Sequence, residues 1–593
     1  MQVLSSRSKV RPTSRQTVSA RLRQRVTRQL RRLFGLQRLR PGQQETIDRV
    51  LRGLNTLAVM PTGAGKSLCY QLPATLLPGL TVVISPLIAL MQDQYDRLQQ
   101  LGVATVQLNS ALDAETQRES LLALDLRQVR VLFTTPERFA DPAFQAMLKQ
   151  QQLALLVVDE AHCISRWGHD FRPAFAEIGT ALLELDSPPV LALTATAADE
   201  VIEDIATQLR IPAAGVLAAS SYRPNLRFGV ETMADEAAKR RRTVEIVAEE
   251  QGAVIVYATT VKAAEAVHSA LLEAGTDADL YHGKLSAPRR RASQMAFMNG
   301  ETRVIVATNA FGLGIDKPDI RLVLHYQLPP GLDAYYQEAG RAGRDGLPAR
   351  CELLFLAGDR AVQQFFLNGR YPTADDGRAL VGLLASGNAA DASGWTLARL
   401  KERLQRPAAK LRVLLNLMRG ERLIDIDREG RISVGAVTAG MVQLDAMLAG
   451  YVERSEQDRA RLEQMVAYAQ TGACRWRALL EGFQEPLPFA DGRCLQCDNC
   501  RRMARHEVEL ERQTEQILPK LDGDAASSQR ESFSPGDYVR VRRYGAGTVV
   551  DASNEAVTVA FGEASERRSF RPDFVKRARV PRRTAGAEIA ASA

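Results

Sequence analysis

Two neighbouring carboxylates, Asp159 and Glu160, directly follow the apolar run Leu-Ala-Leu-Leu-Val-Val at 153–158. Such a run predicts a buried strand of a parallel sheet, and α/β folds bind nucleotides at the carboxyl ends of these strands. There Asp159 can hold Mg²⁺, directly or through water, and Glu160 can orient or deprotonate an attacking water. The pair therefore predicts metal-assisted chemistry on a nucleotide.

A glycine-containing loop at 60–67, Met-Pro-Thr-Gly-Ala-Gly-Lys-Ser, lies between an apolar run at 57–59 and a helical pattern at 68–72. Backbone N–H groups in a strand–loop–helix of this kind cradle phosphates, the lysine reaches the β- and γ-phosphates, and the hydroxyl binds Mg²⁺. The general consensus has glycine where this chain has Met60, and the Thr-Gly-x-Gly-Lys-Ser form is a helicase variant. The candidate nucleotide-binding residues of the loop are Thr62, Gly63, Ala64, Gly65, Lys66 and Ser67, with Ser67 and Asp159 as magnesium ligands.

Aromatic and cationic side chains alternate just beyond the carboxylates. Exposed aromatics among cations suit stacking on unpaired bases and gripping phosphates. Nucleotide chemistry and nucleic-acid contact are thus expected a few residues apart, as a motor requires. The candidate DNA-binding residues of this segment are Trp167, His169, Phe171 and Arg172.

Two arginines, Arg341 and Arg344, are three positions apart in the segment 335–346, which we interpret as a helix that carries both on one side. A solvated charged face is the alternative. Beside the loop at 60–67 and the carboxylate pair, we expect them to reach the γ-phosphate as catalytic arginines, together with Lys66, Asp159 and Glu160.

Short apolar segments alternate with helical patterns in two consecutive series. This alternation predicts parallel sheets with helices on both faces. Two such domains with a nucleotide loop only in the first are the plan of a superfamily 2 helicase core, so the fold class is multidomain α/β with two RecA-like domains. The predicted strands are 56–60, 81–85, 129–134, 153–158 and 190–194 in the first series, and 253–257, 279–282, 303–307, 322–326 and 351–356 in the second.

Four of the seven cysteines are clustered near residue 490, and the other three are scattered. Without an export signal, we interpret the cluster as metal ligands rather than disulfides. Four thiolates suit a closed tetrahedral Zn²⁺ site with a structural role. The predicted zinc ligands are Cys474, Cys494, Cys497 and Cys500.

The 593 residues carry a formal charge of +8, with 45% apolar and 25% charged residues. This composition indicates a globular protein of several domains, and the basic excess suits a polyanionic partner. No window approaches the roughly 18 apolar residues of a membrane span. The first 40 residues contain arginines and no acidic residue, which predicts a disordered basic tail that merges into a helix, with an organelle transit peptide as the alternative.

On these motifs the chain resembles the RecQ family of DNA helicases over roughly residues 30–360 and 459–500. The resemblance implies ATP-driven 3′→5′ translocation on single-stranded DNA with unwinding of forked or duplex DNA, in repair or recombination. It places Gln43, Asp316 and Gln337 at the nucleotide, with Gln43 reading adenine, and it places Arg138 at the DNA. His162 and Gln337 would couple ATP state to domain movement. The matching segments are 34–43, 60–67, 85–90, 135–138, 159–162 (the DEAH box), 167–175, 194–196, 307–318 and 337–346.

The region after the core departs from the usual family order, in which the zinc module follows directly and a winged helix comes next. Here residues 371–458 precede the zinc ligands. Three helical patterns and a hairpin at 423–434 favour a relocated winged helix, with a plain helical spacer as the alternative. The hairpin tip at 428–431 is a candidate strand-separating element.

A compact all-β pattern follows a probable linker and predicts a five-stranded SH3-like barrel, similar to the Tudor-like barrels of some superfamily 1 DNA helicases. It can bind a protein partner, or touch DNA through Arg540, Arg542 and Arg543. The predicted domains are a disordered tail (1–29), RecA-like domains at 30–212 and 213–370, a winged helix (371–436), a zinc module (437–505), a linker (506–532), a barrel (533–580) and a disordered tail (581–593).

The sequence therefore predicts an ATP-dependent 3′→5′ DNA helicase with ATP, Mg²⁺ and Zn²⁺ as cofactors. The alternatives are a DNA translocase or remodeller without unwinding, an RNA helicase, and a nucleic-acid-binding scaffold with an inactive ATPase. We expect a bacterial cytoplasmic, nucleoid-associated protein without a membrane partner, or an organellar one if the basic start is a transit peptide. Neither the oligomeric state nor the preferred DNA structure can be predicted.

Overall fold

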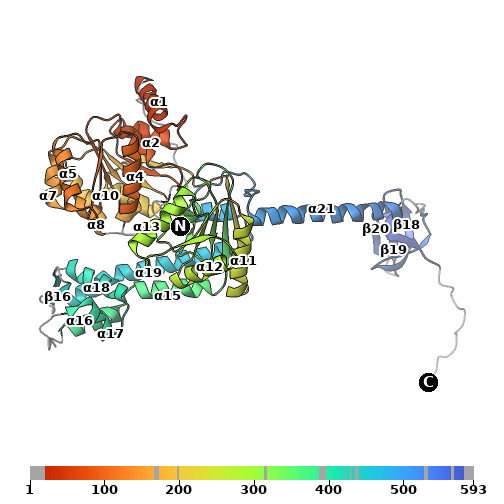
Figure 1. The fold of residues 1–593 in the computed structure, drawn as a ribbon. Helices are drawn as coiled ribbons and strands as arrows, with labels where there is room; N and C mark the ends of the chain where they lie inside the picture. Colours follow the sequence, from red (N-terminus) through yellow and green to blue (C-terminus); the bar gives the residue numbers. More distant parts are fainter. Residues whose placement is uncertain are drawn as a thin grey trace, which may run out of the picture. The chain divides into compact units, whose positions relative to one another are not determined.

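The computed structural model describes residues 20–165, 173–195, 199–312, 315, 317–385, 395–420, 423–427, 430–434, 440–525, 532–562 and 566–579. The chain divides into two compact units, Met1–Arg501 and Arg502–Ala593. Figure 1 shows the elements of both units coloured along the sequence.

The first sheet has seven strands in the order β3-β4-β2-β5-β6-β1-β7, and all of its neighbours are parallel. Apolar side chains fill both faces: Val82 and Ile84 of β2 pack into one core and Val83 into another, as the alternation of a strand requires. All five predicted strands are present. The strands are β1 (Thr56–Val59), β2 (Leu80–Ile84), β3 (Thr105–Leu108), β4 (Val131–Thr134), β5 (Leu153–Val158), β6 (Val190–Thr194) and β7 (Val216–Ala218). The helices around it include α2 (Gln43–Val50), α3 (Leu68–Ala74), α4 (Ile88–Gln100), α5 (Ala114–Asp125), α6 (Pro136–Phe139), α7 (Pro142–Lys149), α8 (Pro173–Ala176), α9 (Ile178–Glu184) and α10 (Asp199–Gln208).

The second sheet has six parallel strands in the order β10-β11-β9-β12-β13-β8. It also contains all five of its predicted strands. The strands of these two sheets that sequence reasoning missed are β3, β7 and β8. All three lie at sheet edges, where a short or partly polar strand lacks the continuous apolar run of a central one. The strands are β8 (Leu226–Thr232), β9 (Ala253–Tyr257), β10 (Ala278–Tyr281), β11 (Val304–Ala307), β12 (Ile320–His325) and β13 (Ala349–Phe355), and the helices are α11 (Glu236–Glu249), α12 (Val261–Glu273), α13 (Ala287–Asn299) and α14 (Leu332–Ala339).

The first helix, α1 (Ala20–Phe34), begins ten positions before the boundary predicted at residue 30. Val26 and Leu30 are buried in a small core with Ile47 and Leu72, so one apolar stripe fixes an otherwise basic helix. The predicted boundary of the disordered tail is therefore ten residues too late. The many arginines of this segment hid the apolar positions Val26 and Leu30 in the sequence pattern.

An accessory module is inserted at the tip of a helical hairpin. The two helices of the hairpin, α15 (Asp359–Arg370) and α19 (Gly440–Gln470), run side by side (Figure 1) and are joined by an Arg360–Glu463 ion pair. The elements between them follow the order helix, strand, helix, helix, strand, strand, which is the order of a winged helix, with β14 as an additional strand that sequence reasoning missed. They are α16 (Ala374–Ala385), β14 (Trp395–Thr396), α17 (Leu397–Leu404), α18 (Ala408–Gly420), β15 (Ile424–Ile426) and β16 (Arg431–Val434).

The module has its own core, which includes Leu380, Leu400, Leu414 and Ile432. Its assignment as a winged helix and its limits at 371 and 436 stay predictions. The centre of the proposed hairpin tip, residues 428–429, lies outside the described residues.

The last helix, α21 (Asp498–Ala525), extends through much of the segment 506–532, whose role as a linker stays a prediction. Strong helix formers such as Glu509 and Gln513, which are hydrogen-bonded one turn apart, continue the helix past the cysteines. Beyond it, a five-stranded antiparallel sheet confirms the predicted all-β region, with the order β20-β19-β18-β17-β21. Its strands are β17 (Tyr538–Val541), β18 (Gly545–Ala552), β19 (Val557–Phe561), β20 (Glu566–Phe570) and β21 (Val575–Arg577).

Among the described residues, no helix combines the length and the apolar character that crossing a membrane requires.

Candidate active site and metal centre

The phosphate-binding loop is fixed by a buried glutamine. Gln43 donates from Nε2 to the carbonyl oxygens of Ala64 (3.0 Å) and Gly65 (2.9 Å). Gly65 has φ +79°, which favours glycine, and a Cβ there would lie 2.6 Å from this Nε2 atom. Glycine at position 65 is therefore required by both the backbone conformation and the close approach of Gln43.

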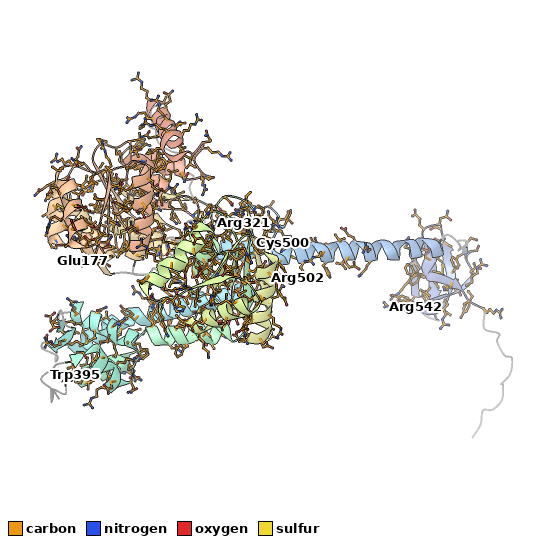
Figure 2. The ribbon with its side chains drawn as sticks, viewed as in Figure 1. Glu177, Arg321, Trp395, Cys500, Arg502 and Arg542 are labelled. Carbon is orange, nitrogen blue, oxygen red and sulfur yellow. The ribbon has the colours of Figure 1, made fainter. Side chains whose placement is uncertain are left out.

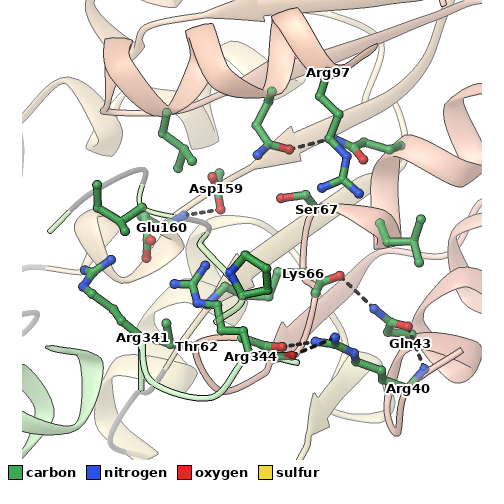
Figure 3. Close-up of a pocket in the computed structure, with 18 of the residues that line it drawn as sticks. Arg40, Gln43, Thr62, Lys66, Ser67, Arg97, Asp159, Glu160, Arg341 and Arg344 are labelled. Carbon is green, nitrogen blue, oxygen red and sulfur yellow. Dashed lines mark hydrogen bonds between the residues drawn. The ribbon is translucent and has the colours of Figure 1, made fainter. Parts of the chain in front are cut away.

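A cavity of about 420 Å³ lies between the two parallel-sheet domains (Figure 3). Residues of the first domain line it together with residues of the second domain that lie before, within and after α14. Figure 3 shows the guanidinium groups of Arg341 and Arg344 on the side that faces Glu160 and Lys66. The predicted site residues that line this cavity are Gln43, Thr62, Gly63, Gly65, Lys66, Ser67, Asp159, Glu160, Gln337, Arg341 and Arg344.

Burial sets the electrostatics of the cavity. It lowers the pKa of Lys66, against the opposing charges of Glu160 and Asp159. It raises the pKa of Asp159, which the neighbouring Glu160 raises further and Lys66 lowers. The Ser67 hydroxyl and the Asp159 carboxylate are the hard oxygen donors that Mg²⁺ prefers, so the donor set fits this cation.

Glu160 is held in an unusual conformation with φ 50° and ψ 48°. For a residue other than glycine this left-handed conformation costs about 1–3 kcal/mol, and such residues concentrate at functional sites. Its buried Oε2 atom has no hydrogen-bond partner among the described residues and lies 3.4 Å from His162 Nδ1. His162 Nδ1 also lies 3.1 Å from Thr194 Oγ1 at the end of β6. The DEAH segment is thereby linked to the neighbouring strand.

The two arginines lie on a turn and not on a helix, which corrects the sequence interpretation. The helix α14 ends at Ala339, because Gly340 and then Gly343, with φ +56°, favour termination. Arg341 is only 4% exposed, and its Nε atom has no hydrogen-bond partner in the described part of the chain. An unsatisfied buried donor is unusual in a native protein and is often found at a functional site.

Sequence reasoning assigned no role to several further arginines around the cavity, among them Arg40, Arg97 and Arg223. Arg40 donates to the carbonyl oxygens of Gly63 and, at 3.1 Å, of Arg344, and so contacts both domains. Arg97 lines the cavity from α4, and Arg223 lies at the chain crossing between the domains. Arg97 and Arg223 lie outside the motifs used above, and their neighbours along the chain gave no signal.

The DNA-contact residues are only partly described. Arg138 lies on α6 with its guanidinium carbon 5.4 Å from the centroid of the Phe144 ring. Its Nη1 atom lies 3.4 Å from Asp141 Oδ2, and 39% of its side chain is exposed. It is thus available to a ligand at the surface. The predicted residues outside the described ranges are Trp167, His169, Phe171 and Arg172, together with Asp316.

The four predicted zinc ligands come together. The sulfur atoms of Cys474, Cys494, Cys497 and Cys500 all lie within 4.8 Å of one another, and all four residues are buried. A tetrahedral site with Zn–S bonds of about 2.3 Å has sulfur–sulfur distances of about 3.8 Å, so the arrangement fits zinc. Cys500 lies in the first turn of α21 (Figure 2).

Backbone N–H groups surround these sulfurs. Cys494 donates to Cys474 Sγ (3.3 Å), and Cys500 donates to Cys497 Sγ (3.4 Å). Such bonds stabilise thiolates and orient them toward a metal. Cys69, Cys163 and Cys351 are buried elsewhere, away from this cluster.

Comparison with known proteins places these sites in a family. The chain matches the family described as DEAD/DEAH box helicase over residues 40–205, the helicase conserved C-terminal domain over 238–346 and RecQ zinc-binding over 439–501. It is 36% identical over 474 residues to "Probable ATP-dependent DNA helicase RecS" of Bacillus subtilis, which covers 79% of this chain and 91% of that protein.

Two further relatives differ in how much they share. The chain is 34% identical to "ATP-dependent DNA helicase RecQ" of Synechocystis sp., over 81% of this chain and 98% of the relative. It is 43% identical to "ATP-dependent DNA helicase RecQ" of Bacillus subtilis, but over only 56% of each chain. The RecQ zinc-binding match supports Zn²⁺ at the four cysteines. From these matches and the cavity geometry, the chain belongs to the RecQ family of helicases.

Proposed function

We propose that this protein hydrolyses ATP in the interdomain cavity to translocate 3′→5′ on single-stranded DNA and to unwind duplexes. The observation that carries the proposal is the approach of Arg341 and Arg344, from the second domain, to Lys66, Asp159 and Glu160 of the first. A site divided in this way is complete only when both domains close on the nucleotide, so hydrolysis is coupled to domain movement.

Each residue has a role that its surroundings support. Lys66 binds the β- and γ-phosphates, and Ser67 and Asp159 hold Mg²⁺, which supplies charge neutralisation to the phosphates when bound. Glu160, whose buried Oε2 accepts no hydrogen bond among the described residues, accepts the proton of the attacking water. Arg341 and Arg344 stabilise the charge that develops on the γ-phosphoryl group.

Gln43 and Gln337 complete the nucleotide contacts at the two sides of the cavity. Gln43 reads the adenine edge while it braces the loop. Gln337 and His162 line a second cavity that also contacts Asp458 and Arg461 of α19, so they connect the ATP site with the accessory hairpin. This is a route by which nucleotide state reaches the strand-binding elements.

DNA as the substrate is supported by the relatives' names and by the basic charge. Arg138 and the segment 167–172 are proposed to contact the strand, and the zinc centre to stabilise the module that carries it. The accessory module is proposed to act as a winged helix on the duplex, and the C-terminal sheet to bind a protein partner. The bacterial cytoplasmic location stays a prediction.

Strand displacement tests the proposal. Duplexes with a 3′ or a 5′ single-stranded tail are incubated with and without ATP, next to a Lys66→Ala variant. We expect displacement of the 3′-tailed duplex alone, lost in the variant. Displacement of the 5′-tailed duplex would overturn the polarity, and RNA-dependent rather than DNA-dependent ATPase activity would favour an RNA helicase.

The position of the accessory module favours one alternative. The module is inserted at the far end of a helical hairpin, and a module moved from its usual place can guide DNA without separating it. ATP hydrolysis stimulated by DNA without displacement of either duplex would identify a translocase or remodeller.

A further inference from the structure

The two parallel-sheet domains are joined by a short crossing segment, residues 219–225. It leaves β7 at the edge of the first sheet and enters β8 at the edge of the second. Any rotation of one domain against the other must change the backbone of this segment or the contacts of its side chains. The segment therefore lies where domain movement and catalysis can be connected.

Arg223 in this segment binds the turn that carries the catalytic arginines. Its Nη1 atom donates to the carbonyl oxygen of Gly340 (2.7 Å), and its Nη2 atom donates to those of Ala342 (2.8 Å) and Gly343 (2.6 Å). Nη1 also lies 3.4 Å from the Thr62 carbonyl oxygen in the phosphate-binding loop. One guanidinium thus holds three carbonyl oxygens of the turn and contacts the opposite domain.

The chemistry of this contact is that of a cation at the end of a helix. The carbonyl oxygens after Ala339 lack helical partners, and a cation there is favourable because the helix dipole is negative at this end. Asn225 adds bonds to Gly343 (2.8 Å) and Leu347 (2.9 Å). A Cβ on Gly343 would lie 2.5 Å from Asn225 Nδ2, so the turn fits closely against the crossing segment.

The zinc module holds the same segment from the other side. Glu485 accepts hydrogen bonds from the backbone N–H (2.7 Å) and the hydroxyl (2.5 Å) of Ser221. The ring of Tyr222 packs edge to face against the rings of Trp476 and Phe489, with distances between ring centroids of 5.0 Å and 5.7 Å. Trp476 also donates to the Leu226 carbonyl oxygen (3.1 Å) at the start of β8. Three residues between Cys474 and Cys494, namely Trp476, Glu485 and Phe489, therefore contact the crossing segment.

We propose that Arg223 is a positioning residue for the catalytic arginines, and that the zinc module, through Glu485, holds Arg223 in place. The zinc module then acts on the rate of ATP hydrolysis and not only on stability. This inference rests on the proposed function, since it requires that Arg341 and Arg344 act on ATP. It goes beyond that function by assigning a role to residues outside the nucleotide cavity.

Steady-state ATPase activity of the full chain, with saturating oligo-dT, tests the first part. Arg223→Ala should lower kcat about 100-fold, the effect of a displacement of about 1 Å, with KM for ATP changed less than about twofold. Arg223→Lys should recover part of kcat, because an ammonium can bind carbonyl oxygens without the fork geometry. Arg227→Ala, an exposed arginine on β8, is the matched control and should equal wild type.

Zinc content and thermal unfolding are measured for every variant, and a folded Arg223→Ala chain keeps one zinc per chain. An unchanged kcat in a folded variant overturns the proposal, and so does a raised KM at constant kcat. If wild type itself hydrolyses no ATP, the proposed function fails instead, which separates the two failures.

The second part compares Glu485→Ala with Glu481→Ala, whose carboxylate pairs with the exposed Arg477 on the same helix. Glu485→Ala should lower kcat about tenfold and retain zinc, and Glu481→Ala should change neither. In the double variant with Arg223→Ala, the loss should be smaller than the product of the two separate losses, because both residues act on one segment. Full multiplicativity, or wild-type kcat in Glu485→Ala, would overturn the role of the zinc module.

Discussion

The nucleotide cavity and the zinc centre both gather distant side chains, but they are built in opposite ways. The cavity joins residues from Leu36 to Arg344 across two domains. The zinc centre joins residues between Cys474 and Cys500 within one buried cluster. A divided site can be switched by movement, whereas a closed one can only be kept or lost. Changes to cavity residues should therefore alter the rate of ATP hydrolysis in a folded chain, and loss of a zinc ligand should alter folding first.

Loss of zinc should have the largest effect. Structural zinc sites contribute about 10–16 kcal/mol of apparent binding free energy, which is folding free energy for a small module. Cys497→Ser should release zinc, unfold residues 439–501 and abolish ATPase activity, because the crossing segment loses its support. Zinc content and limited proteolysis measure this. Cys351→Ala, a buried thiol outside the cluster, is the control and should retain zinc; an active, zinc-free Cys497→Ser chain would contradict a structural role.

Removal of a catalytic arginine should have the next largest effect and leave the fold intact. Arg344→Ala should lower kcat by about 10³–10⁵, the range for arginines that stabilise phosphoryl transfer, with nucleotide affinity nearly unchanged. ATPase rates and binding of a fluorescent ATP analogue measure the two quantities. Arg360→Ala removes an exposed ion-paired arginine on α15 and should leave both unchanged. A kcat loss below tenfold for Arg344→Ala would assign the main role to Arg341.

The buried ion pair between Lys239 and Asp359, at the base of the accessory hairpin, should stabilise the fold and not take part in catalysis. Lys239 is fully buried, and its Nζ atom lies 2.7 Å from an Asp359 oxygen at the start of α15. Asp359→Ala leaves that charge without its partner and should cost about 3–5 kcal/mol of unfolding free energy. Urea unfolding measures the loss. Asp375→Ala on α16 breaks an exposed pair with Arg378 and should cost about 0–1 kcal/mol; equal losses in both variants would contradict the distinction.

Features with a strong local signal could be predicted from the sequence, and features without one could not. Central strands and the loop at 60–67 carry strong local signals, apolar runs and glycines, and they lie where expected. The cysteines are close in sequence and share one chemistry, so their cluster followed from spacing. Edge strands such as β7 lacked an apolar run long enough to detect.

The contacts of Arg223 and Glu485 could not be predicted, because they join positions more than a hundred residues apart and satisfy backbone carbonyl and N–H groups. A carbonyl oxygen has no residue type, so no pattern in the sequence marks it. The arginine turn was misinterpreted as a helix for a related reason. Glycines occur both within helices and at helix ends, so Gly340 and Gly343 did not show where the helix stops. The close packing of Gly343 on Asn225 fixes the turn at this position.

The pH dependence of the unfolding free energy should be the smallest of these effects. It should again distinguish residues that stabilise the fold from residues of the nucleotide cavity. Glu352 on β13 is buried, and burial raises its pKa from 4.5 to about 7, against the lowering effect of Arg350. The folded chain then binds more protons than the unfolded chain between these values, so unfolding free energy falls as pH rises through this window, by up to about 1.4 kcal/mol per pH unit.

Glu352→Gln should remove this contribution, so its unfolding free energy should depend less on pH between 5 and 7 than that of wild type. Glu245→Gln, an exposed carboxylate on α11, is the control. Because Glu352 lies in a sheet and not at the cavity, kcat should have the same pH profile in Glu352→Gln as in wild type. A shifted pH profile of kcat would mean that a change in β13 alters the turn that carries Arg341 and Arg344. Residues that set stability would then also affect the rate.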